Sequence, residues 1–389
     1  MMTAKTFDLY RLKGQPFELG RYDVERIGRN AEWERLQQII AQAQQSRSPV
    51  NAVLLGTYGA GKSFLLWKLA EGLRPATKSG VFALGPIRLV DPEQKKDFTR
   101  NLVLRLFVRG MDIESDLVPL LQNVSAPKAG WPSGLRPHVD LLLALTRPEA
   151  ATFARRVLMG SRILRKEAES AGITETLQIK TSDDAIALIQ ALQLVLHSAG
   201  VTAIAMLIDE VEYVDALAKG QRTAVLDSLK HLWDQQVDFF SKGAEAATLL
   251  ILMAATPSFW QRLKMQITTE AGRGESGVGI TPFFARIPQS HVIEMPAELE
   301  PKEARRLIVS RMSEERAGHK KEGIIPFTDD YVDYVYELSQ GLPRQIIEIC
   351  GVVLAEAAQR KLKSIDADAA KRILNDLLIS YEPISEKVS

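Results

Sequence analysis

Residues 56–63 read Gly-Thr-Tyr-Gly-Ala-Gly-Lys-Ser and have the spacing G-x-x-x-x-G-K-S of a phosphate-binding loop, the P-loop. Its glycines let the backbone turn without Cβ clashes, so the loop N–H groups can point at phosphate oxygens beside the next helix. The Lys62 ammonium would reach the β- and γ-phosphates, and the Ser63 hydroxyl would ligate Mg²⁺. We therefore predict a nucleotide site whose binding residues are Gly56, Thr57, Tyr58, Gly59, Ala60, Gly61, Lys62, Ser63 and Phe64.

A second pair of reactive groups follows the apolar run at residues 203–208, which reads Ala-Ile-Ala-Met-Leu-Ile. A buried parallel strand there would deliver Asp209 and Glu210 at its carboxyl end, where open α/β sheets hold their ligands. Asp209 would hold Mg²⁺, and Glu210 would polarise the water that attacks a phosphate. The alternative is a pair of solvated acids at a strand end; an upstream P-loop favours the functional interpretation.

Three further residues are candidates for the catalytic set. Thr256 ends the apolar run 248–255 and could contact the γ-phosphate, or equally cap the helix that Pro257 begins. Arg286 follows a glycine-rich loop and could reach the nucleotide of a neighbouring subunit, although an ordinary ion pair is the alternative. Arg273, within that loop, is its rival. Arg344 follows Gly341-Leu-Pro and would project from a helix start toward the nucleotide, or lie on the surface beside a turn.

The remaining candidates are weaker. Residues 151–170 form a basic amphipathic stretch that could bind nucleic acid, although a solvated helix face is the simpler interpretation. The five histidines are scattered without metal-ligand spacing. The single cysteine excludes an intrachain disulfide framework and fits a reducing compartment.

The secondary-structure pattern alternates strands with helices. Strands are expected at 50–55, 81–90, 202–208, 248–255 and 290–294, and residues 93–200 are expected to be helical throughout. Helices are also expected from 301 to 378. This order predicts an α/β core at 49–295 with a parallel sheet in three layers and a helical insertion at 93–200. An N-terminal linker and helix at 1–48 and an all-α lid at 296–389 complete the predicted domains.

Composition sets broad limits. The 389 residues are 46% hydrophobic, and 49 basic residues nearly balance 48 acidic ones, so net charge gives no sign of a polyanionic partner. Neither an N-terminal signal sequence nor a membrane-spanning run is evident, so we expect a cytoplasmic protein without membrane contacts.

Taken together, these motifs resemble the AAA+ ATPases of the initiator-like branch, which includes origin-recognition, TnsC-like and ExeA-like proteins and is related to the STAND ATPases. Ile27-Gly28-Arg29-x-x-Glu32 is similar to the GRxxE segment of this branch, and Gly341-x-Pro343-Arg344 to its GxPR element. The resemblance implies Walker A at Lys62 and Ser63, Walker B at Asp209 and Glu210, sensor 1 at Thr256 and sensor 2 at Arg344. The long helical insert, the segment at 208–212 and the Thr-Pro-x-Phe at 256–259 also resemble the ATP-binding proteins of BREX-type phage-defence systems.

This resemblance implies an ATP hydrolase that uses Mg²⁺, forms homo-oligomers and acts on double-stranded DNA or a DNA-bound partner. Replication initiators append a winged-helix domain after the lid, whereas the residues after Arg344 suffice for a lid, so DNA contact is expected from the ATPase ring or the insertion. Two alternatives stay open: a STAND-like signalling switch acting on proteins, and a scaffold that binds nucleotide without turnover. Glu210 argues against the scaffold because that carboxylate serves hydrolysis.

Overall fold

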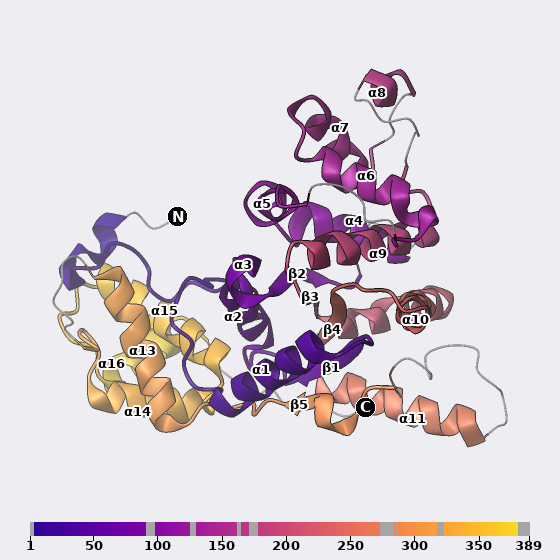
Figure 1. Cartoon of the computed structure of the whole chain (residues 1–389). Helices are drawn as coiled ribbons and strands as arrows, with labels where there is room; N and C mark the ends of the chain where they lie inside the picture. The colour runs from indigo at the N-terminus through magenta and orange to yellow at the C-terminus, as the bar shows by residue number, and fades with distance from the viewer. Residues whose placement is uncertain are drawn as a thin grey trace. The chain divides into compact units, whose positions relative to one another are not determined.

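The computed structural model describes residues 4–90, 98–124, 130–161, 165–170, 178–272, 284, 286–316 and 323–379. By its internal contacts the chain divides into two compact units. The sheet unit comprises Glu32–Leu55 and Leu66–Glu294. The terminal unit comprises Met1–Ala31, Gly56–Leu65 and Met295–Ser389, so it combines both ends of the chain with the P-loop. Each unit is described below by itself (Figure 1).

The sheet unit is built on a parallel sheet with the strand order β2-β3-β4-β1-β5. Its strands are β1 (Val50–Leu55), β2 (Val81–Arg88), β3 (Ala203–Asp209), β4 (Thr248–Ala255) and β5 (Val292–Glu294). β4 lies between β1 and β3, so the strand that leads to the P-loop and the strand that ends in Asp209 are separated by one strand. All carboxyl ends share one edge because the strands run parallel.

Both faces of the sheet are covered. Successive strand residues point to opposite faces, and β1 and β4 are buried along their whole length. Ile204, Met206 and Ile208 pack in one cluster with buried residues of the helices inserted between β2 and β3. The predicted α/β class with a parallel sheet is therefore confirmed.

Helices surround this sheet. Between β2 and β3 the described secondary-structure elements are all helices. The helices of the unit are α1 (Asn30–Gln45), α2 (Lys62–Leu73), α3 (Ala76–Ser79), α4 (Phe98–Arg109), η2 (Ile113–Leu117), α5 (Val118–Leu121), η3 (Ser133–Leu135), α6 (Arg136–Ala144), α7 (Pro148–Leu158), α8 (Arg165–Ser170), α9 (Ser182–Ser198), η4 (Val211–Ala216), α10 (Lys219–Ser241), α11 (Pro257–Gly272) and η5 (Gln289–His291), with the first residues of α1 and α2 belonging to the terminal unit.

The basic stretch of the insertion is divided. The basic stretch at 151–170 is not continuous, because α7 ends at Leu158 and Gly160 adopts a left-handed φ of 78°. In this stretch Arg155 pairs with Glu114, and Arg156 with Glu167. Arg273 lies outside the described residues.

The terminal unit is helical. It contains η1 (Ala4–Tyr10), α13 (Pro301–Glu315), α14 (Asp329–Ser339), α15 (Pro343–Gln359) and α16 (Ala367–Asp376). Residues 7–29, here called the strap, run across α13 and α15. The Tyr10 hydroxyl donates to the Leu362 carbonyl over 2.7 Å, and the Gln15 amide to the Gly351 carbonyl over 2.9 Å. The strap thus shares one apolar core with the four helices that follow it by almost 300 residues. No helix in the described part of the chain is long and apolar enough to cross a membrane.

Candidate nucleotide-binding site

The P-loop has the backbone that its glycines predict. Gly59 and Gly61 lie in the left-handed region, with φ of 84° and 101°. A Cβ atom on Gly59 would lie 3.0 Å from the Cβ of Arg344, whereas one on Gly61 would meet nothing within 4 Å. Gly59 is therefore required both by its backbone angle and by the close approach of a second element.

The Lys62 side chain folds back over the loop. It is buried, and its ammonium donates to the carbonyl oxygens of Gly56 over 2.7 Å and Thr57 over 3.2 Å. Gly56 is itself enclosed, since a Cβ there would lie 3.2 Å from the Lys62 side chain. The positive charge is thus held at the loop, as phosphate binding requires.

Ser63 and Phe64 begin the helix after the loop. Ser63 is the second residue of α2, so its hydroxyl, an oxygen ligand of the kind that Mg²⁺ prefers, lies at this helix start. The Phe64 ring stacks on Tyr22 of the strap with centroids 6.4 Å apart. Phe64 therefore belongs to the apolar side of the site.

Arg344 lies beside the P-loop. It is the second residue of α15, and its backbone N–H points at the Gly59 carbonyl over 3.4 Å. Its guanidinium lies over the Tyr58 ring, 4.7 Å from the centroid, and donates to Glu348 over 2.9 Å. Gly341 has a φ of 72° and Pro343 opens the helix, as the sequence predicts.

The surroundings of Gly28 and Arg29 explain why these two residue types occur before α1. Gly28 has a left-handed φ of 66°, which favours glycine, and a Cβ there would lie 2.5 Å from a carboxylate oxygen of Glu303, which would have to move. Arg29 donates to the carbonyl oxygens of Ala60, Ala297 and Glu298 over 3.4, 3.2 and 3.0 Å. Arg29 therefore ties the P-loop to the chain segment that leads into α13.

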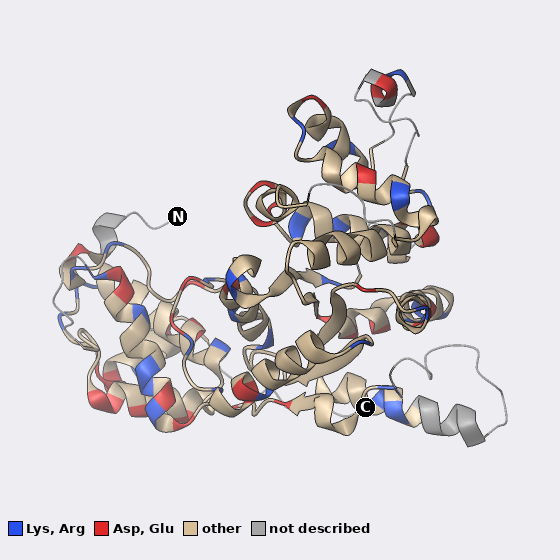
Figure 2. Ribbon diagram, in the orientation of Figure 1, with Lys and Arg blue, Asp and Glu red and all other residues tan. Residues whose placement is uncertain are grey.

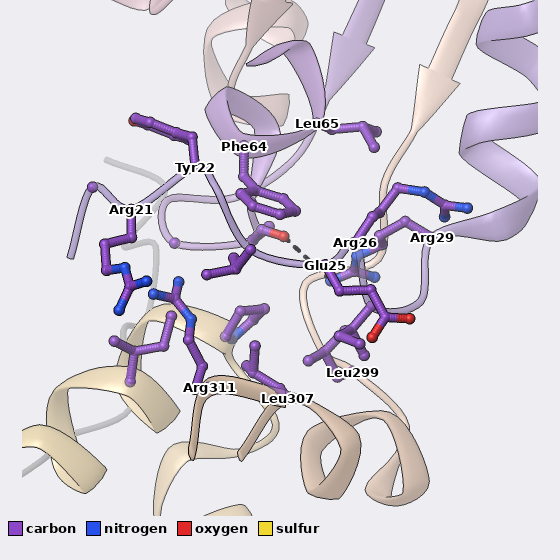
Figure 3. Close-up of a pocket in the computed structure, with 18 residues that line it drawn as sticks. Arg21, Tyr22, Glu25, Arg26, Arg29, Phe64, Leu65, Leu299, Leu307 and Arg311 are labelled. Carbon is purple, nitrogen blue, oxygen red and sulfur yellow. Dashed lines mark hydrogen bonds between the residues drawn. The ribbon is translucent and has the colours of Figure 1, made fainter. Parts of the chain in front are cut away.

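A pocket within the terminal unit joins these elements (Figure 3). Three segments line it: the strap, the P-loop with the start of α2, and the helices α13 and α15. Its wall is mainly apolar, and it runs from the backbone of Gly59–Gly61 toward Arg21 and Arg311. Sequence reasoning missed the strap and α13 as contributors, because neither carries a recognisable phosphate motif. The lining residues used below are Val24, Ile27, Phe64, Leu299, Leu307 and Ile347.

In the sheet unit, the acidic pair ends β3. The backbone N–H of Glu210 donates to the Asp209 carboxylate over 2.9 Å, and Glu210 has a left-handed φ of 53°. Backbone in this region is costly for a non-glycine residue, and such residues cluster at functional sites. The Glu210 carboxylate pairs with Arg88, which ends β2 directly beside Asp209.

Two other predicted residues have local partners. The Thr256 hydroxyl accepts from the Phe259 N–H over 3.4 Å, which caps the start of α11. Arg286 pairs with Asp234 of α10, so the ion pair that we considered as its alternative is present. Neither arrangement tests a nucleotide contact, and both roles stay predictions.

A larger cavity of about 530 Å³ lies at the opposite edge of the sheet, beside the amino end of β4 at Thr248 and between Arg47 and His197. Ligands of parallel sheets bind at the carboxyl edge, so we do not assign the nucleotide there. No group of three or more His, Cys, Asp or Glu side chains that could hold a metal is found within the described ranges.

Comparison with known proteins agrees with these features. Residues 156–267 match the family model of the BREX system ATP-binding protein BrxC/D. This segment contains β3 with Asp209 and Glu210, and β4 with Thr256. The predicted similarity to BREX-type ATP-binding proteins is therefore confirmed for this segment.

Among solved structures, a chain from Drosophila ORC bound to DNA matches with a TM-score of 0.47 and 11% sequence identity. The match covers 96% of this chain and 66% of that one, so this chain spans slightly less than two thirds of the ORC chain's length. No curated protein matches the sequence.

Proposed function

We propose that this protein is an AAA+-type ATP hydrolase that uses Mg²⁺ and acts on DNA or on a DNA-bound partner. The observation that carries the proposal is the position of Arg344, whose helix start lies against Gly59 of the P-loop. A second cation beside the phosphate loop is unexpected for an ordinary glycine turn. It is expected where a triphosphate must be held from two sides.

The residues divide the chemistry among them. Lys62 and the loop N–H groups bind the phosphates, and Arg344 adds positive charge beside them. Ser63 and Asp209 supply the hydroxyl and carboxylate oxygens that suit Mg²⁺, which neutralises charge on the β- and γ-phosphates when bound. Glu210 accepts a proton from the attacking water as the bond from the γ-phosphorus to its bridging oxygen breaks. The apolar part of the pocket takes the base.

Glu210 needs a change of partner before it can act. Its carboxylate pairs with Arg88, and a carboxylate neutralised by a guanidinium is a poor proton acceptor. We propose that the active arrangement separates this pair. The Arg88 side chain is well exposed and also lies over the Tyr213 ring at 5.4 Å, so it retains a partner after release.

The target is proposed on the family resemblance. The motifs resemble initiator-like ATPases and the ATP-binding proteins of BREX-type phage-defence systems, and the matched family model is that of a BREX system protein, so we propose a role on DNA in defence or mobile-element biology. Basic and acidic residues are interspersed over the helices of both units rather than separated by sign (Figure 2). A STAND-like switch acting on protein partners is the alternative.

The test is steady-state ATP hydrolysis with and without duplex DNA, together with size-exclusion profiles in ADP and in a non-hydrolysable ATP analogue. DNA stimulation with ATP-dependent assembly is the expected result. ATP-dependent assembly that is indifferent to DNA would favour the signalling switch. Assembly without turnover would favour a scaffold, and absence of ATP binding would overturn the proposal altogether.

A further inference from the structure

Arg311 is a buried cation that lacks a full set of partners. It lies on α13, only 4% of it is exposed, and it lines the pocket described above. Of its five N–H donors, one reaches the Glu18 carbonyl over 3.3 Å, and the buried Nε–H has no partner among the residues that the structure describes. Burial lowers the pKa of this guanidinium. A buried donor without an acceptor is costly, so such a group calls for an explanation.

A neighbouring buried arginine shows the contrast. Arg316 lies five residues further along the chain, directly after the last residue of α13, and is 5% exposed. Its guanidinium donates to the Ile325 carbonyl and to the Tyr10 carbonyl, which joins the strap to the lid helices. Arg316 therefore has an evident structural role, whereas Arg311 differs from it in lining the pocket.

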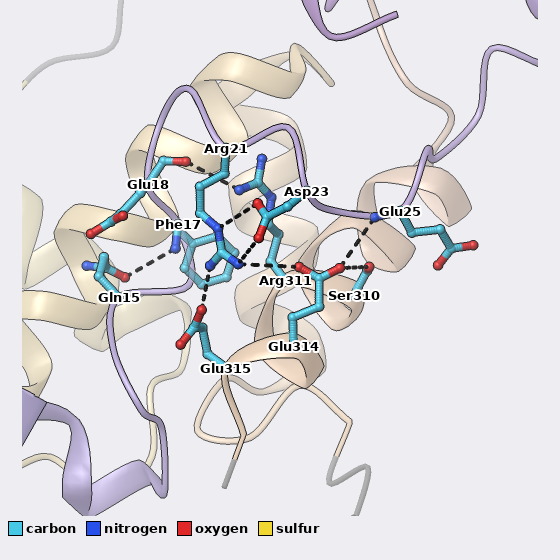
Figure 4. A network of polar contacts seen from close by, with 10 residues as sticks. All are labelled: Gln15, Phe17, Glu18, Arg21, Asp23, Glu25, Ser310, Arg311, Glu314 and Glu315. Atoms are coloured by element: carbon cyan, nitrogen blue, oxygen red, sulfur yellow. Dashed lines mark hydrogen bonds and ion pairs between the residues drawn. The ribbon is translucent and has the colours of Figure 1, made fainter. Parts of the chain in front are cut away.

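The carboxylates near Arg311 form ion pairs with a second arginine, Arg21 (Figure 4). Arg21 of the strap pairs with Asp23 over 3.2 Å, with Glu315 over 2.6 Å and with Glu314 over 3.9 Å. Two guanidinium groups and three carboxylates leave this cluster with a formal charge of −1. A phosphate group would be repelled here, so a neutral hydrogen-bond acceptor is the ligand chemistry that Arg311 fits.

The pocket around Arg311 fits a flat apolar ring. Figure 3 shows the guanidinium groups of Arg21 and Arg311 together at one end of the pocket, with Arg26 and Arg29 at the other. Gly59, Ala60 and Gly61 of the P-loop line the same pocket, so a nucleotide whose phosphates bind the loop N–H groups would place its base in this pocket. Ile27, Leu307 and Ile347 line the space between them. A purine has this combination of apolar faces and neutral ring-nitrogen acceptors.

We propose that Arg311 reads the base: its guanidinium donates a hydrogen bond to a ring nitrogen of the purine bound in this pocket. The inference rests on the proposed nucleotide binding and adds a specificity-determining residue to it. Arginine has donors and no acceptor, so it recognises the nitrogen acceptors of the ring and not the exocyclic amino group of adenine.

The test uses ATP and its 1-deaza, 3-deaza and 7-deaza analogues, each of which replaces one ring nitrogen with a C–H group. Dissociation constants are measured by calorimetry for the wild-type protein and for Arg311→Met. We expect one analogue to bind the wild-type protein about tenfold more weakly than ATP, as for loss of a hydrogen bond to a charged group. Arg311→Met should bind ATP as weakly as the wild-type protein binds that analogue, with no further loss for the analogue itself.

The matched control is Arg305→Met on the same helix, where the exposed side chain pairs with Asp329. It should leave all four affinities unchanged. If Arg311→Met does not fold, Arg311→Lys retains the charge without the planar fork and serves the same comparison.

Equal binding of ATP and all three analogues by the wild-type protein would overturn the inference and leave the proposed function standing. An equal loss of affinity for all four ligands in Arg311→Met would show a purely structural role and would also overturn it. A wild-type protein that binds none of the four would overturn both.

Discussion

The two units hold different parts of the proposed chemistry. In the terminal unit, cations are held at the P-loop: Lys62 donates to loop carbonyls, and Arg344 lies over Tyr58. In the sheet unit, the carboxylate of Glu210 is held by a cation, Arg88. One region is thus arranged to receive an anion, and the other keeps its proposed base neutralised. The contrast indicates that ATP binding and ATP turnover should be separable by mutation.

The largest separation between ATP binding and ATP turnover is expected for Glu210→Gln. Loss of a general base lowers a rate by roughly 10²–10⁴-fold, so kcat should fall by that factor while the Kd for ATP stays within about twofold. Single-turnover kinetics and calorimetry measure the two quantities. Glu212→Gln, two residues further on, is the control and should keep normal turnover. Undiminished hydrolysis in Glu210→Gln would show that its assigned role is wrong.

Lys62→Ala should affect ATP binding, whereas Glu210→Gln should affect ATP turnover. It removes the buried ammonium at the phosphate loop, so ATP affinity should fall by about a hundredfold or more. Calorimetry with a non-hydrolysable analogue measures this loss without interference from turnover. The control is Lys68→Ala on the same helix, where the ammonium pairs with Glu71. If Lys62→Ala kept the ATP affinity of the wild-type protein, the proposed phosphate-binding role of the loop would be wrong.

Arg344→Ala tests whether the lid helix α15 takes part in binding. The arginine lies over Tyr58 and its loss should weaken ATP binding by about tenfold. Arg360→Ala, at the other end of the same helix, removes pairs with Glu356 and Asp376 and should leave affinity unchanged. Equal effects of the two variants would indicate that helix stability, and not contact with nucleotide, explains the result.

The smallest effect is expected for Arg88→Met. Release of Glu210 from its ion pair should raise basal kcat by a few fold without changing the Kd for ATP. Arg262→Met, which removes a pair with Asp215 in the same unit, is the control. A fall in kcat would mean instead that Arg88 holds Glu210 in its productive orientation.

Local chemistry made several parts of the site predictable. The P-loop spacing, the apolar run before Asp209 and the Gly-x-Pro-Arg turn are each encoded within a few residues, and the structure forms the loop, the strand and the helix start where they were expected. The insertion was harder to interpret, because the break at Gly160 depends on one left-handed residue in an otherwise helical pattern. The Arg88–Glu210 pair could not be foreseen, since it depends on the register of β2 against β3.

The sequence by itself determined which residues can hold phosphate and metal, because a glycine loop and a strand end impose their geometry locally. It also determined the alternation of strands and helices, through the periods of the apolar residues. Only the tertiary structure decided that the strap packs with helices almost 300 residues away and that the buried Arg311 lines the pocket beside the P-loop. Such contacts arise from the burial of apolar surface between distant segments, and no local pattern records which distant segment will be the partner.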